Sequence, residues 1–92
     1  MTDTKLETRF TIPPQVMSRL VEDETVLLDL ASGLYFGLDG VGKRIWESVS
    51  AGDSLEETVA VISAEYDVGE AQAEADVIAF TSELVERDLL SR

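Results

Sequence analysis

The chain has 92 residues, of which 45% are hydrophobic and 28% charged, and it contains neither cysteine nor histidine. This length fits one domain spanning residues 1–92, and the apolar content is too high for a disordered chain. The two missing residue types exclude disulfides, thiolate metal sites, thiol catalysis and imidazole acid–base chemistry. We therefore expect no catalytic site, no metal site and no other cofactor.

The charge balance narrows the choice of partners. Nineteen acidic and seven basic residues give a net charge of −12. A field of this sign repels phosphate backbones and anionic lipid surfaces, so we expect neither nucleic acid nor a membrane as a partner. Residues 1–10 do not resemble a signal peptide, and no apolar stretch approaches the roughly 18 residues of a membrane span. A soluble protein of the cytoplasm is expected.

The first part of the chain carries weak structural signals. Residues 1–8 are polar and aperiodic, which predicts a flexible lead. Residues 9–12 alternate polar and apolar side chains before Pro13 and Pro14, which predicts a short strand that the prolines end. Residues 16–21 fit either a strand or a coil, because their alternation is ambiguous.

Two apolar runs, at 26–30 and 34–38, predict a β-hairpin. A three-residue loop ending at a left-handed Gly33 would put both runs on one apolar face. That register pairs Leu30 with Leu34, Leu28 with Phe36, and Val26 with Leu38. A two-residue loop would expose one of the runs, so the three-residue loop is favoured. The opposite face would then carry Leu27, Asp29, Tyr35 and Gly37.

Three helices are predicted after the hairpin. The first begins after Asp39 and ends at Gly52, with Trp46 in the core. The second begins at a capping box formed by Ser54 and Glu57 and ends near Glu65. The third runs from a cap at Gly69 to near Asp88, and Leu89-Leu90 then folds back onto the core. Strands followed by helices predict an α+β fold, with the helices on one face of a small antiparallel sheet.

The third predicted helix carries more apolar surface than one contact needs. Its core face holds Ala73, Val77, Phe80 and Leu84, and a neighbouring stripe holds Ile78, Thr81 and Val85. An open strand edge beside such a groove is typical of peptide capture by strand addition, although a merely protected edge is the alternative. The adjacent Lys43 and Arg44 either decorate the first helix or dock an acidic partner.

The hairpin, the Val41-Gly42 and Ile45-Trp46-Glu47 segments, and the apolar positions of the third helix resemble the PqqD family from about Glu24 to Leu90. The resemblance implies a winged-helix-like domain, with a three-stranded antiparallel sheet followed by three α-helices. It also implies that the domain recognises leader peptides in the biosynthesis of ribosomally made, post-translationally modified peptides. The leader would lie as an added strand between the third strand and the third helix. Carried over to this chain, the peptide-binding residues are Leu34, Tyr35, Phe36, Gly37, Leu38, Glu74, Asp76, Val77, Ile78, Thr81 and Val85.

Two residues depart from the family pattern. Thr81 stands where many relatives have leucine, which implies a more polar groove. Asp88 stands where many have glycine, which implies a different end to the helix. The hairpin is also unlike that of the pyrroloquinoline-quinone branch, and this favours a lasso-peptide or radical-enzyme pathway.

The resemblance implies two partners: the leader region of a precursor peptide, and a maturation enzyme such as a leader peptidase, a cyclase or a radical SAM enzyme. A homodimer is also open, because the same strand edge could pair with itself. The main rival interpretation is a winged-helix DNA-binding regulator, and a small acidic enzyme is a third. Charge argues against the regulator, because residues 70–88 hold six acidic side chains and one arginine.

Overall fold

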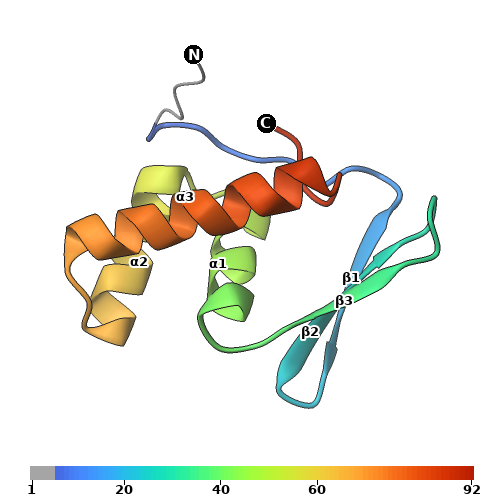
Figure 1. The fold of residues 1–92 in the computed structure, drawn as a ribbon, viewed down its shortest axis with the longest axis horizontal. Coiled ribbons are helices and arrows are strands. Elements are labelled where there is room, and N and C mark those ends of the chain that lie inside the picture. The colour runs from blue at the N-terminus through green and yellow to red at the C-terminus, as the bar shows by residue number, and fades with distance from the viewer. Residues whose placement is uncertain (1–5) are drawn as a thin grey trace.

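A computed structural model describes residues 6–92 and shows three strands followed by three helices (Figure 1). The elements are β1 (Val16–Val21), β2 (Glu24–Asp29), β3 (Tyr35–Leu38), α1 (Gly40–Ser50), α2 (Leu55–Tyr66) and α3 (Glu70–Glu86). The strands form an antiparallel sheet in the order β1-β2-β3. The predicted α+β class is therefore confirmed. None of the helices in this part of the chain is long and apolar enough to span a membrane.

The segment before β1 differs from its prediction. Residues 1–5 of the expected flexible lead lie outside the described range, but the carbonyl oxygens of Leu6 and Thr8 accept hydrogen bonds from the first amides of α2, at 2.8 and 2.9 Å. The strand expected at 9–12 is also wrong, because Arg9 pairs with Ser54 while Thr11 pairs with Ser91. Arg9 and Thr11 thus pair with two different segments of the chain instead of with one partner strand.

The hairpin between β2 and β3 has a longer loop than predicted. The backbone amide of Asp29 donates to the Leu34 carbonyl oxygen at 2.9 Å, which leaves four residues, 30–33, in the loop. The Asp29 carboxylate accepts from the Ala31 amide at 2.9 Å and so fixes the turn, and Gly33 takes φ +78° as its last residue.

The extra loop residue shifts the register by one, so Leu27 pairs with Phe36 and Thr25 with Leu38. A one-residue slip moves a whole strand to its other face. Leu27 is therefore completely buried, whereas Val26 and Leu28 point away from the helices and are only half-buried. The predicted pairing of Leu30 with Leu34 is also wrong, because Leu34 lies opposite Asp29, and both leucine side chains are more than half exposed.

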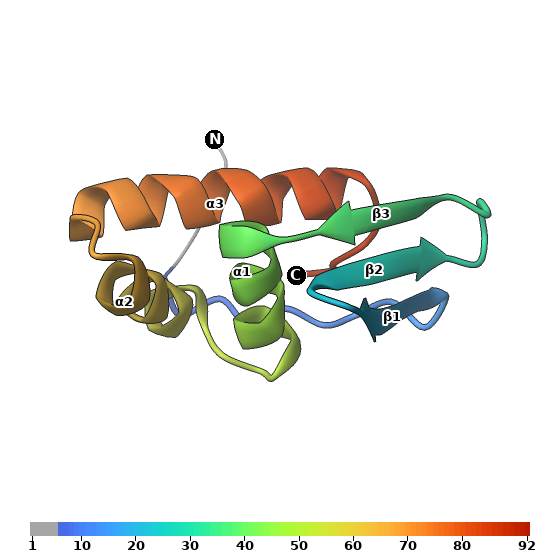
Figure 2. The ribbon, with the colours of Figure 1, turned by 90° about the horizontal axis from the view of Figure 1, so that it is seen from below.

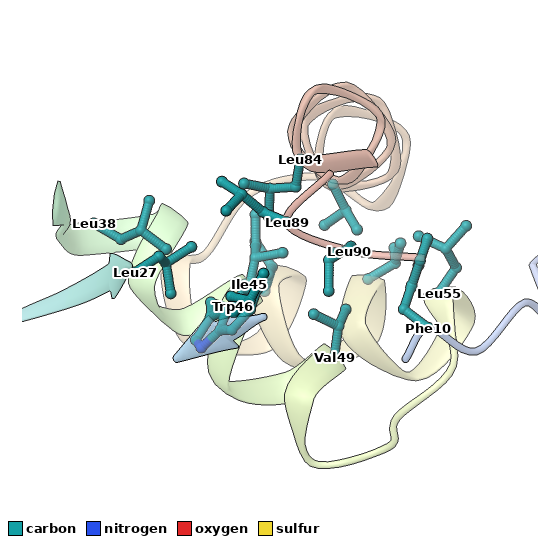
Figure 3. Packing of buried hydrophobic residues seen from close by; sticks show 14 of the residues in the cluster. Phe10, Leu27, Leu38, Ile45, Trp46, Val49, Leu55, Leu84, Leu89 and Leu90 are labelled. Carbon is teal, nitrogen blue, oxygen red and sulfur yellow. The ribbon is translucent and has the colours of Figure 1, made fainter. Parts of the chain in front are cut away.

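The hydrophobic core joins the inner face of the sheet to the three helices (Figure 3). Leu27 and Leu38 come from the sheet, and Ile45 and Trp46 from α1. Leu89 and Leu90 fold back into the core after α3, as predicted, and are 0% and 2% exposed. Phe10 of the N-terminal segment also packs there. The predicted core position of Trp46 is confirmed, because it is 2% exposed.

Local signals place the helix ends. The capping box of α2 is confirmed: the Ser54 hydroxyl accepts from the Glu57 amide at 3.1 Å, and the Glu57 carboxylate accepts from the Ser54 amide at 2.8 Å. This second hydrogen bond lowers the pKa of Glu57, with help from Arg9. After α3, Asp88 takes the left-handed φ of +61° that glycine usually supplies, so the chain can turn back toward the core.

Candidate functional site

The outer edge of β3 is open in the described part of the chain, because β3 lies at the end of the sheet and pairs only with β2. The carbonyl oxygen of Leu34 accepts from β2, and consecutive residues of an antiparallel strand alternate in the direction of their backbone groups. The N–H and C=O groups of Tyr35 and Gly37 therefore point away from β2. This edge can accept one further strand.

Helix α3 runs beside this edge, with β2 and β1 farther away (Figure 2). Its buried side carries Ala73, Val77, Thr81 and Leu84. On one flank of that side, Asp76, Phe80 and Arg87 are spaced by four and seven residues and therefore share a face. The Arg87 guanidinium lies over the Phe36 ring, 5.2 Å from its centre, so this flank is the one that borders β3.

An open pocket of about 420 Å³ lies where β3, α1 and α3 meet. It is lined by Gly37, Leu38, Asp39, Val41, Gly42, Ile45, Asp76 and Phe80. A Cβ atom on Gly42 would lie only 3.1 Å from two ring atoms of Phe80. The bare glycine thus lets the aromatic ring rest against α1, and the ring forms one apolar wall of the pocket.

The cleft between β3 and α3 differs in charge along its length. Asp39 and Asp76 both line the pocket at the C-terminal end of β3, where the Gln72 amide nitrogen donates to Asp76 at 2.9 Å. Arg87 lies near Phe36, toward the other end, and pairs with Glu83 at 3.1 Å. The cleft thus offers an acidic rim, an apolar pocket and open backbone groups, which suit an extended segment carrying apolar and basic side chains.

The residues that the sequence assigned to the cleft fall into three groups. Of residues 34–38, the last four form β3 with its open edge, and Leu34 directly precedes that strand. Asp76 lines the pocket beside β3. Val77 and Thr81 lie in the interior, 0% and 1% exposed, where the Thr81 hydroxyl donates to the Val77 carbonyl oxygen at 2.8 Å. The expectation that Thr81 makes the groove more polar is therefore wrong.

The third group lies on the other flank of α3. Glu74, Ile78 and Val85 are spaced by four and seven residues, and Ile78 is about 160° around the helix from Phe80. Glu74 lines a pocket with Leu6 and α2, and Val85 lines a hollow with Pro13 and Gln15. The structure does not bring these three side chains to the β3 edge.

Sequence reasoning missed several residues of the pocket. Phe80 was assigned to the core, although it is only half-buried, and Val41 and Gly42 were counted as parts of the first helix. The useful signal is the spacing from Asp76 through Phe80 to Arg87, which marks a second flank of α3.

The basic pair on α1, Lys43 and Arg44, forms hydrogen bonds with other segments of this chain. The Lys43 ammonium donates to the Asp23 carbonyl oxygen at 3.2 Å, and the Arg44 guanidinium makes two hydrogen bonds to the Glu65 carboxylate at 2.9 and 3.0 Å. These hydrogen bonds raise the pKa of Arg44 and lower the pKa of Glu65.

Three antiparallel strands, three helices and an open edge beside an apolar pocket define a small α+β domain with a groove suited to an extended peptide. The model of one protein family, described as coenzyme PQQ synthesis protein D (PqqD), matches residues 24–90. The chain belongs to the PqqD family, which confirms the resemblance drawn from its sequence.

Two solved structures are similar to this chain. The first is TbiB1 in complex with the TbiA(beta) leader peptide, with 44% identity, coverage of 87% of this chain and 93% of the other, and a TM-score of 0.83. The second is a lasso peptide synthetase B1 complexed with the leader peptide, with 26% identity, coverage of 92% and 100%, and a TM-score of 0.86. No curated protein gave a significant match.

Proposed function

We propose that this chain is a non-catalytic adaptor that binds the leader region of a ribosomal precursor peptide in a lasso-peptide pathway. The observation that carries the proposal is the open β3 edge beside the pocket walled by Phe80. The similarity of this chain to two B1 proteins solved with leader peptides supports this assignment. The absence of cysteine and histidine agrees with a binding role.

The leader would bind as a fourth strand. Its backbone would exchange hydrogen bonds with Tyr35 and Gly37, and alternate side chains would point into the cleft. One apolar side chain would fill the pocket against Phe80, and a neighbouring basic side chain would lie near Asp76. The proposed contact surface is therefore residues 34–38 with the Asp76, Phe80 and Arg87 flank of α3.

An adaptor of this kind delivers its peptide to an enzyme. In a lasso-peptide pathway we assign that role to a leader peptidase, in preference to a cyclase or a radical SAM enzyme. The adaptor supplies affinity for the leader and leaves the reaction to the enzyme, so leader affinity and turnover can be measured separately.

Calorimetry with the leader of the precursor encoded beside this chain tests the proposal. We expect a dissociation constant in the nanomolar to micromolar range, about −8 to −12 kcal/mol, after ordering of the peptide has cost about 2–5 kcal/mol. The TbiA(beta) leader serves as a comparison peptide. If the leader at about 100 µM produced no heat and did not compete, leader binding would be contradicted.

The DNA-binding alternative receives no support from the comparisons. Its recognition helix would be α3, on which Glu70, Glu74, Asp76, Glu83 and Glu86 are acidic. We expect no complex with random duplex DNA in a gel-shift assay at low salt, where electrostatic binding is strongest. A shifted band that weakens with added salt would revive the regulator.

A further inference from the structure

The face of the sheet that points away from the helices is unusually apolar. The register places Met17, Arg19 and Val21 of β1, Val26 and Leu28 of β2, and Tyr35 of β3 on this outer face. Met17, Val21 and Tyr35 are 53%, 48% and 72% exposed. The solvated face of an antiparallel sheet normally carries polar residues, and contiguous exposed apolar side chains mark interaction sites.

The outer face is also shaped to receive a partner. A hollow of about 300 Å³ is lined by Met17, Ser18, Arg19, Val21, Val26 and Leu28. Arg19 lies among these apolar side chains, directly across from Val26. Within residues 6–92 no carboxylate lies within ion-pair distance of Arg19, whereas Arg9, Arg44 and Arg87 each pair with a glutamate. An unpaired guanidinium on an apolar surface suits a partner that presents a carboxylate among apolar groups.

We propose that this outer face docks the leader peptidase that processes the bound precursor. The inference rests on the proposed function, because an adaptor must hold its peptide and its enzyme at the same time. The peptide cleft uses the free edge of β3 and one flank of α3, whereas the hollow lies on β1 and β2, so both can be occupied together.

A second copy of this chain is the less suitable occupant. Each copy carries a net charge of −12, so association of two copies is opposed by charge repulsion. The outer face also offers little negative charge with which Arg19 of a second copy could pair. Its other charged side chain among the three strands is Glu24, whose carboxylate lies beside Gly37 on β3, at the opposite edge of the sheet from β1. A peptidase surface with an acidic side chain opposite Arg19 complements the face better.

The double variant Met17→Thr, Val21→Thr tests the proposal. Threonine is β-branched, which strands favour, but it replaces the apolar side chains with a shorter polar one. The matched control is Leu20→Thr, because Leu20 lies on the same strand and is 64% exposed but points to the opposite face. The probe is the purified leader peptidase encoded with this chain, added to the chain already saturated with its leader.

We expect the double variant to weaken peptidase binding at least tenfold, while Leu20→Thr changes it less than twofold. Leader affinity measured by calorimetry should be unchanged in both, so a failure of leader binding is seen separately. Arg19→Glu should also weaken peptidase binding, with a difference from wild type that shrinks as salt is added.

Wild-type peptidase affinity in the double variant and in Arg19→Glu would overturn the proposal, as would an equal loss in Leu20→Thr. Sedimentation of each protein alone gives a further outcome. A dimer that dissociates in the double variant would assign this face to a second copy instead of the peptidase.

Discussion

Replacing Phe80 with alanine is expected to lower leader affinity by at least about 30-fold, the loss that follows from removing an aromatic hot spot worth about 2 kcal/mol. The ring forms a wall of the pocket between β3, α1 and α3, and it rests on the bare backbone of Gly42. Truncation removes the apolar surface against which a leader side chain would pack.

The matched control for this prediction is Ile78→Ala. Ile78 lies on α3 two residues away and is half-buried like Phe80, but it faces the other flank of the helix. Both truncations should lower the melting temperature, since both remove apolar contacts with the protein. Only the Phe80 variant should lose affinity by calorimetry. If Ile78→Ala weakens binding and Phe80→Ala does not, the leader lies on the opposite flank of α3.

Replacing Tyr35 with proline is expected to lower leader affinity at least about tenfold, because proline removes one backbone donor and fixes φ near −65°. The amide of Tyr35 points to the open edge, so the β2 ladder keeps its own hydrogen bonds. Proline is tolerated at such edge positions. The fold should therefore survive the change.

Tyr35→Thr separates the backbone from the side chain in this test. It removes the ring but keeps the amide, so it should retain most of the affinity if strand addition carries the binding. Circular dichroism of each variant reports whether the sheet is intact. A folded Tyr35→Pro protein with wild-type affinity is the result that would remove the β3 edge from the site.

Short-range signals were sufficient to predict most elements of this fold. The Ser54 and Glu57 capping box lies within four residues, and it places the start of α2 correctly. The loop of the hairpin could not be predicted in the same way. The four-residue loop is held by the Ala31 amide on the Asp29 carboxylate, the Gly33 amide on the Asp29 carbonyl oxygen and the Leu30 amide on the distant Gln15 carbonyl oxygen, whereas Gly33 would also permit the shorter turn.

The orientation of α3 shows a second limit. Phe80 and Thr81 are neighbours, and hydrophobicity favours burial of Phe80. In the structure Thr81 is the buried one, because its hydroxyl is satisfied by a carbonyl one turn earlier, while Phe80 lies partly open at the cleft. Which flank of an apolar helix meets β3 depends on packing between distant segments. The family resemblance predicts a binding groove between β3 and α3, but the side chains that line the pocket there follow from this packing.

The four-residue length of β3 has a consequence for the lifetime of the complex. The outward groups of Tyr35 and Gly37 allow about four backbone hydrogen bonds, which together contribute about 2–6 kcal/mol net. This falls short of the about 8 kcal/mol that micromolar affinity requires. With the leader bound as proposed, its residence time would therefore be set by the side chains in the cleft, since affinity differences between related complexes arise mostly in the dissociation rate. A precursor with a poorer pocket side chain would exchange faster, and one adaptor could serve several precursors in turn.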